Sequence, residues 1–118
     1  MKFYERKEIK DILSYLRLIA NPSDEVSLGR ILNVPSRKIG DKSQEKALDY
    51  LRSQFITLDT LTEDMVPAMG LPALANRGMI SFIANYRLLY SLSHESGVED
   101  VVIQLIKAIK YEDFLKEE

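Results

Sequence analysis

Apolar residues recur at spacings of three and four along most of this chain, and that pattern is typical of amphipathic helices. The first stripe lies in residues 5–20. Its apolar members are Ile9, Ile12, Leu13, Leu16, Ile19 and Ala20. Asn21 and Pro22 end the predicted helix, because the residue before a proline is pushed out of the α region.

Two further helices are expected in the first half. Ser27 can cap a short helix that runs to Val34 and is ended by Pro35. The inner face of that helix would be formed by Leu28, Ile31 and Leu32. After a turn at residues 35–43, a third helix of about three turns is indicated by Ala47, Leu48, Tyr50 and Leu51.

The second half continues the helical pattern. Residues 57–66 predict a short helix that Pro67 and Gly70 close. Pro72 suits the first turn of a long helix that ends near Ser93. Its inward residues would be Ile80, Ile83, Ala84, Leu88 and Leu92. Gly97 breaks the chain, residues 98–109 predict another helix, and residues 111–116 a final one.

These elements predict an all-α fold, because no run of alternating β-branched residues is long enough to indicate a sheet. We expect residues 1–118 to form a single compact domain of about six or seven helices. The helical pattern still continues at the last residues. That observation favours a domain that belongs to a longer protein.

Composition and charge narrow the class of protein. The chain has no cysteine, which excludes disulfides and thiolate metal sites and suits a reducing cytoplasm. No apolar run approaches the roughly 20 residues that cross a bilayer, so we expect a cytoplasmic location and no membrane partner. Residues 1–52 hold 11 Lys and Arg against 8 Asp and Glu, a net charge of +3, whereas residues 53–118 hold 5 against 10, a net charge of −5. The basic surface is therefore expected in the first half.

A basic turn connects the second and third predicted helices and reads Pro35-Ser36-Arg37-Lys38-Ile39-Gly40-Asp41-Lys42-Ser43. Gly40 can take a positive φ, so the chain can turn sharply there. The next helix can start at Asp41 or Ser43, either of which can cap it. A helix start favours anions, and Arg37, Lys38 and Lys42 would surround it with three cations. Without further context, the turn is more typical of an ordinary capped connection between two helices.

Two runs of sequence resemble a known family. Residues 3–22 read FYERKEIKDILSYLRLIANP, and residues 30–40 read RILNVPSRKIG. Together they resemble the start of the 2B subdomain of UvrD/Rep/PcrA-type superfamily 1 DNA helicases, and the spacing between the runs is similar too. Beyond residue 43 the likeness is one of length and helical pattern only. The family usually has a glycine where this chain has Lys38.

The resemblance implies a duplex-DNA-binding and regulatory accessory subdomain of an ATP-dependent 3′-5′ DNA helicase that acts in DNA repair or replication. The basic turn would be helix-hairpin-helix-like. DNA-binding residues would be Arg37, Lys38, Ile39, Gly40, Asp41, Lys42 and Ser43, with Lys10 as a secondary contact. Partners would be duplex DNA, including its junction with a single strand, other helicase subdomains and repair proteins. ATP and Mg²⁺ would be cofactors of the parent protein, and this chain would hold none.

The isolated chain is not expected to be an enzyme. No Gly-x-x-x-x-Gly-Lys-Ser/Thr loop for ATP phosphates occurs in it. His94 is the only histidine, so a histidine-based metal cluster is excluded, and we predict no catalytic or metal-binding residues. Adjacent acidic pairs such as Glu63 and Asp64 point in different directions on a helix and indicate a solvated surface.

Two alternatives remain open. Phe82, Tyr86 and Tyr90 are spaced four residues apart and could stack on bases of single-stranded DNA, although core packing is favoured at that spacing. The chain could also be a helical protein-interaction module, whose acidic second half docks a repair or replication partner while the basic turn is merely structural. A salt-dependent DNA titration distinguishes this function from DNA binding.

Overall fold

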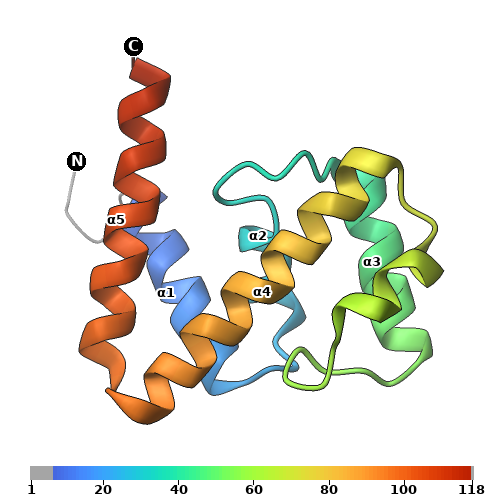
Figure 1. The fold of residues 1–118 in the computed structure, drawn as a ribbon, viewed down its shortest axis with the longest axis horizontal. Helices are drawn as coiled ribbons and strands as arrows, with labels where there is room; N and C mark the ends of the chain where they lie inside the picture. The colour runs from blue at the N-terminus through green and yellow to red at the C-terminus, as the bar shows by residue number, and fades with distance from the viewer. Residues whose placement is uncertain (1–6, 118) are drawn as a thin grey trace.

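Figure 1 shows a computed structural model of the chain, which describes residues 7–117, with side chains described for residues 7–108. Its elements are α1 (Lys7–Ala20), α2 (Glu25–Ile31), α3 (Asp41–Ser53), the 3-10 helix η2 (Glu63–Met69), α4 (Ala73–Glu95) and α5 (Val98–Glu117). Every element among the described residues is helical, which confirms the predicted all-α class. None of these helices is both long and apolar enough to cross a bilayer.

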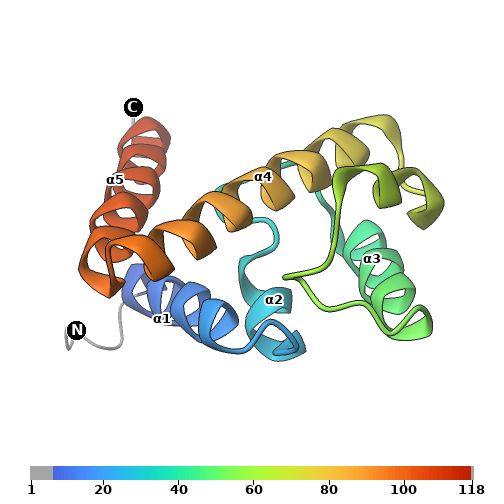
Figure 2. The ribbon, with the colours of Figure 1, turned by 60° about the horizontal axis from the view of Figure 1, so that its bottom comes forward.

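Helix α4 runs along the whole length of the molecule, with α1, α2 and α3 on one side of it (Figure 2). At one end α5 packs against both α1 and α4. At the other end η2 contacts α4 and α3. The segment between α2 and α3 passes close to α4, and this segment contains the basic turn.

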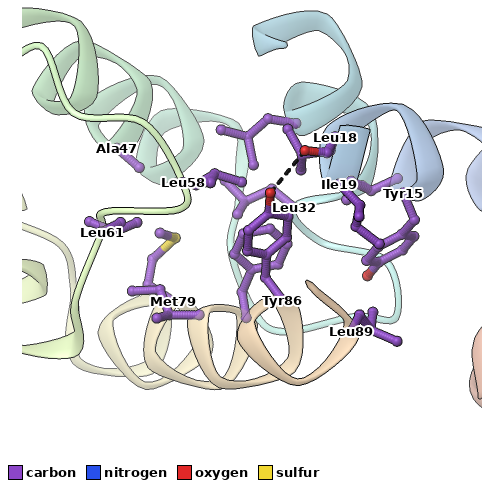
Figure 3. Close-up of a cluster of buried hydrophobic side chains, with 14 of the residues drawn as sticks. Tyr15, Leu18, Ile19, Leu32, Ala47, Leu58, Leu61, Met79, Tyr86 and Leu89 are labelled. Carbon is purple, nitrogen blue, oxygen red and sulfur yellow. Dashed lines mark hydrogen bonds between the residues drawn. The ribbon is translucent and has the colours of Figure 1, made fainter. Parts of the chain in front are cut away.

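The core lies between α4 and the helices beside it (Figure 3). The buried residues of α4 are Ala75, Gly78, Met79, Phe82, Ile83, Tyr86 and Leu89. Phe82 and Tyr86 are therefore core residues, as the favoured interpretation held. Ala84 and Leu88 were expected to face inward, but both are exposed, and Leu88 keeps 68% of its surface. The aromatic rings of Phe82 and Tyr86 bury more apolar area than Ala84 and Leu88 would, so the helix directs the rings inward instead.

Helix α1 buries polar residues as well as apolar ones. Ile12 and Ile19 are buried as predicted, and Leu13 is exposed. Asp11 is buried because its carboxylate forms an ion pair with Arg30 of α2, with Arg30 Nε 2.9 Å from Asp11 Oδ1. Burial raises the pKa of Asp11 above its usual value, and the nearby Arg30 guanidinium opposes that rise. The pair joins α1 to α2.

Several predicted helix ends were wrong. Asp24, and not Ser27, caps α2, because Asp24 Oδ1 accepts a 3.0 Å hydrogen bond from Ser27 N. Ser27 Oγ donates to the same carboxylate and is buried. Pro67 was expected to help close the helix of residues 57–66, but it lies inside η2, which begins at Glu63. Gly70 with φ 72° ends η2, as predicted.

The C-terminal region is one helix and not two. Gly97 takes φ 89° and separates α4 from α5, as predicted. Helix α5 then continues through the position where a break was expected, because residues 109–111 contain neither glycine nor proline.

Candidate nucleic-acid interface

The segment that carries the basic turn lies against α4 at a single glycine. A Cβ atom added to Gly78 would be 2.1 Å from the carbonyl oxygen of Arg37 and 3.0 Å from Ile39 Cγ1. Only a residue without a side chain therefore allows the backbone of the turn to come this close to α4. A glycine in the middle of a long helical pattern is the signal that could have pointed to this contact.

Arg37 is inside the protein, with 8% of its surface exposed. Its Nη1 donates to the carbonyl oxygens of Ile31 (3.2 Å), Leu32 (2.9 Å) and Val34 (2.9 Å). Ile31 and Leu32 are the last residue and the C-cap of α2, so the guanidinium adds hydrogen bonds to the carbonyls at the end of this helix. Its positive charge also suits the negative end of the helix dipole.

Two other helices hold the same guanidinium. Arg37 Nη2 donates a 2.9 Å hydrogen bond to the hydroxyl oxygen of Tyr15 on α1, and that hydroxyl in turn donates to the carbonyl of Val34. The guanidinium carbon lies 5.1 Å from the ring centroid of Phe82 on α4, within the range of a cation–π contact. The arginine therefore joins α1, α2 and α4 at the base of the turn.

The tip of the turn is organised by one amide side chain. Asn33 Oδ1 accepts hydrogen bonds from the backbone N–H groups of Arg37 (2.6 Å) and Ile39 (3.2 Å), the two neighbours of Lys38. Lys38 itself is exposed and has φ 62°, in the left-handed region. We expected the positive φ at Gly40, which instead has φ −74°. Glycine adopts the conformation of Lys38 without steric cost, so the glycine that the resemblance implies at this position would fit the same turn.

Helix α3 begins directly after the turn without a side-chain cap. Gly40 is its N-cap, and a Cβ added there would meet nothing within 4 Å, so the space before the helix is open. The prediction that Asp41 or Ser43 caps the helix was wrong, because both already lie within its first turn. Asp41 and Lys42 are exposed, whereas Ser43 is buried.

The predicted DNA-binding residues thus fall into two groups. Lys38, Gly40, Asp41 and Lys42 are exposed around the start of α3, and Lys10 is exposed on α1. Arg37, Ile39 and Ser43 are buried. Sequence reasoning did not identify Asn33, Tyr15 or Gly78 as parts of this site. Tyr15 and Gly78 act through contacts between residues far apart in the chain, whereas Asn33 bonds the turn from positions only 4 and 6 residues away.

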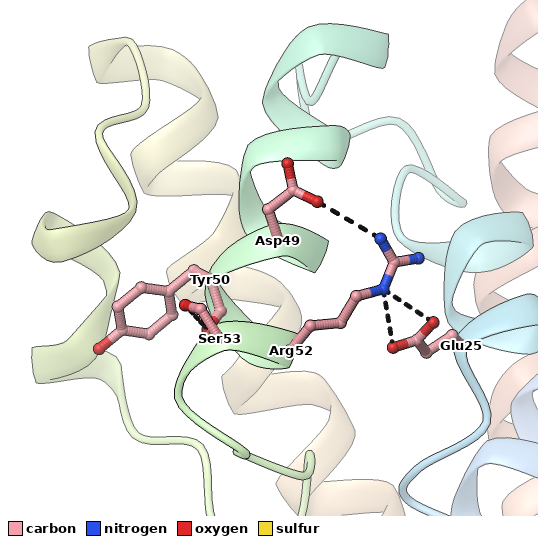
Figure 4. Close-up of polar contacts among 5 residues, drawn as sticks. All are labelled: Glu25, Asp49, Tyr50, Arg52 and Ser53. Atoms are coloured by element: carbon pink, nitrogen blue, oxygen red, sulfur yellow. Dashed lines mark hydrogen bonds and ion pairs between the residues drawn. The ribbon is translucent and has the colours of Figure 1, made fainter.

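The opposite end of α3 has a different character (Figure 4). Arg52 Nε lies 3.0 Å from Glu25 Oε2 of α2, and Arg52 Nη1 lies 3.3 Å from Asp49 Oδ1. Phe55 follows the helix with 94% of its surface exposed, beside a cavity of about 390 Å³. Within the described residues, no group of three or more His, Cys, Asp and Glu side chains is placed to hold a metal ion.

Comparison with known proteins gives a consistent match. The UvrD-like helicase C-terminal domain matches residues 1–69. An ATP-dependent DNA helicase PcrA from Staphylococcus epidermidis is 41% identical over 121 residues, covering 99% of this chain and 16% of the relative. A protein of the same name from Staphylococcus aureus is 39% identical over 121 residues, with the same two coverages. The chain therefore spans 16% of the length of these curated relatives.

Proposed function

This chain belongs to the family of UvrD-like helicase C-terminal domains, and we propose that it is a duplex-DNA-binding and regulatory accessory subdomain of an ATP-dependent 3′-5′ DNA helicase. The parent protein would act in DNA repair or replication. ATP and Mg²⁺ would bind to other parts of the parent, since this chain lacks a phosphate-binding loop for ATP. Its partners would be duplex DNA next to a single-strand junction, and the other helicase subdomains.

The open start of α3 is the observation that carries this proposal. Gly40 leaves room for an anion, and the first N–H groups of α3 have no side-chain cap. The positive end of the helix dipole lies at the same place. Lys38 and Lys42 are exposed on the two sides of Gly40 and would each neutralise a phosphate. Phosphate contacts of this kind position a duplex without reading its sequence.

The other predicted residues would support this contact in different ways. Arg37 and Ile39 would hold the turn from inside, and Ser43 would pack within the first turn of α3. Asp41 is exposed in the same first turn, where its carboxylate stabilises the helix and repels a phosphate. Lys10 on α1 would be a secondary contact. Phosphate binding at the start of α3 would therefore rely on Lys38 and Lys42, and not on the three cations that the sequence indicated.

A salt titration tests the proposal directly. Binding of a short fluorescent duplex would be measured by anisotropy at several salt concentrations. Two neutralised phosphates predict that log K falls with log salt at a slope of about −2, and a third would make it about −3. Lys38→Ala should lower the steepness by about one unit.

Lys107→Ala is the matched control, because it removes an exposed lysine from α5. It should leave the slope unchanged. If Lys38→Ala and Lys107→Ala lowered the salt slope equally, only net charge would matter for binding. The assignment of the turn as the DNA contact would then be rejected. The same preparation mixed with ATP and Mg²⁺ should show no hydrolysis above background.

One observation favours the alternative of a protein-interaction module. Phe55 exposes nearly all of its ring beside a cavity lined by Leu28, Leu48, Leu51 and Leu58, and large exposed aromatics often mark binding surfaces. On this hypothesis Phe55→Ser would weaken binding of a repair or replication partner and leave duplex affinity unchanged. An absence of any salt-dependent duplex binding by the unmodified chain would make this the better proposal.

A further inference from the structure

Two buried tyrosines in this protein make the same kind of hydrogen bond at different places. Tyr86 on α4 is 1% exposed, and its hydroxyl donates a 2.8 Å hydrogen bond to the carbonyl of Leu18 on α1 (Figure 3). Tyr15 on α1 is 2% exposed, and its hydroxyl donates to the carbonyl of Val34. The first bond joins α4 to α1, whereas the second joins α1 to Val34, the residue directly before the basic turn.

The Tyr15 hydroxyl has a second partner, Arg37, which lies in the turn itself. Besides donating to Val34, it accepts a hydrogen bond from Arg37 Nη2. A single oxygen thus bonds both Val34, just before the turn, and Arg37 within it. Arg37 is the residue directly before Lys38, and its side-chain position constrains the backbone from which Lys38 projects.

We propose that Tyr15 is a positioning residue for DNA binding: through Arg37 and Val34 it fixes the backbone that directs Lys38 toward a phosphate. This inference rests on the proposed role of the turn in duplex binding. Arg37 then serves as the link between α1 and the turn and contributes no charge to the phosphate. Tyr15 is enclosed and does not touch DNA itself.

The chemistry of arginine supports the link. Three carbonyl oxygens, one hydroxyl and one aromatic ring surround a planar group whose donors have a fixed geometry. A lysine at position 37 would keep the charge but could not reach these acceptors together. An arginine that only neutralises a phosphate tolerates replacement by lysine, whereas an arginine that positions the turn does not.

The experiment compares Tyr15→Phe with Tyr86→Phe in the 118-residue chain. Each variant removes from a buried ring one hydroxyl that donates to a backbone carbonyl. Tyr15→Phe should shift the backbone amide resonances of residues 36–42 in the free protein and weaken duplex binding about three- to tenfold, because the hydroxyl's hydrogen bonds to Val34 and from Arg37 are both lost. The salt slope should stay unchanged, because both lysines remain. Tyr86→Phe should leave those amides and the duplex affinity as they are.

Arg37→Lys provides the second variant. It should weaken binding at least as much as Tyr15→Phe, and circular dichroism would establish that it is folded. Retention of full affinity and slope by Arg37→Lys would identify Arg37 as a phosphate cation and overturn the inference. Equal amide shifts and equal affinities for Tyr15→Phe and Tyr86→Phe would overturn it too. Failure of the unmodified chain to bind duplex would reject the proposed function, while the amide shifts would still decide whether Tyr15 sets the turn.

Discussion

The two ends of α3 share an unusual backbone conformation and have different reasons for it. Lys38 precedes the helix with φ 62°, and Phe55 follows it with φ 54°. A residue with a side chain adopts this left-handed conformation at a cost of about 1–2 kcal/mol. Helix α3 has 13 residues, so the two sites are on the order of 20 Å apart.

At the C-terminal end the cause is local. Phe55 N donates to the carbonyl of Arg52 at 3.3 Å, and Ile56 N donates to the carbonyl of Leu51 at 2.9 Å. This pair of bonds is a Schellman motif, in which the residue at the position of Phe55 is usually glycine. The conformation of Phe55 therefore follows from the way the helix ends.

At the N-terminal end tertiary contacts act together with local ones. The peptide groups on both sides of Lys38 are bonded to Asn33, and Arg37 is held by Tyr15 and Phe82 from two other helices. Both bonds that fix the backbone at Phe55 come from the end of α3 itself. Strain at Lys38 is coupled to the surface that we propose binds DNA, since backbone strain tends to persist where surrounding contacts enforce it.

The largest expected effect comes from the glycine that lets the turn approach α4. Gly78→Ala would place a methyl group 2.1 Å from the Arg37 carbonyl oxygen, so either α4 or the turn must move. We expect a loss of about 3 kcal/mol of unfolding free energy in a urea titration.

Gly29→Ala is the matched control within α2. Its new methyl group would make an ordinary 3.4 Å contact with Gln44 Nε2. Alanine is also the better helix former by about 1 kcal/mol, so this variant should be neutral or more stable. A neutral result for Gly78→Ala would contradict the tertiary cause of the Lys38 conformation.

Replacement of each left-handed residue by glycine sharpens the comparison. Lys38→Gly and Phe55→Gly should each raise the unfolding free energy by about 1 kcal/mol, because relief of the backbone strain exceeds the added freedom of the unfolded chain. A duplex titration should then distinguish the two variants by their affinity and salt slope. Lys38→Gly loses one phosphate contact and about one unit of salt slope, whereas Phe55→Gly binds like the unmodified chain. Loss of affinity in Phe55→Gly would show that the C-terminal end also contacts DNA.

Asp41 should have opposite effects on stability and binding. Its carboxylate lies in the first turn of α3, so Asp41→Asn should cost about 0.3–1 kcal/mol of stability. The same change removes a charge that repels phosphate and should tighten duplex binding about two- to fivefold. Asp64→Asn in the first turn of η2 is the control and should leave binding unaltered. Weaker binding by Asp41→Asn would argue against a phosphate at this helix start.

The smallest effect is expected from the ion pair at the C-terminal end of α3. Glu25 and Arg52 are both about half exposed, with side-chain exposures of 48% and 54%, so solvent screens their attraction. Glu25→Gln should change the unfolding free energy by at most about 0.5 kcal/mol and should not affect duplex affinity. A change above about 1 kcal/mol in thermal unfolding would indicate that this end is held more tightly than its exposure implies.

The sequence predicted local features well and tertiary ones poorly. Gly70 and Gly97 were expected to end helices, and both take positive φ. The same conformation at Lys38 was not predicted, because it depends on the approach of α4 as well as on the local bonds to Asn33. The burial of Arg37 was missed for a similar reason, since Tyr15 and Phe82 are distant in sequence and come together only in the fold.

Helix faces show the same limit. The periodicity of α4 predicted a long helix correctly, yet it did not decide which of two apolar stripes faces the core. Ala84 and Leu88 lie on the stripe that is exposed, and Phe82 and Tyr86 on the one that is buried. Periodicity establishes that a helix is amphipathic, while the choice between adjacent stripes depends on the neighbours that it meets.

A chemical-shift titration with a short DNA duplex at low salt tests the central claim most directly. If the start of α3 is the contact, the amides of residues 36–44 should shift progressively with added duplex and return toward their free positions when salt is raised. The amides around Phe55 should stay in place. Shifts confined to residues 58–118, with the turn unaffected, would contradict the account.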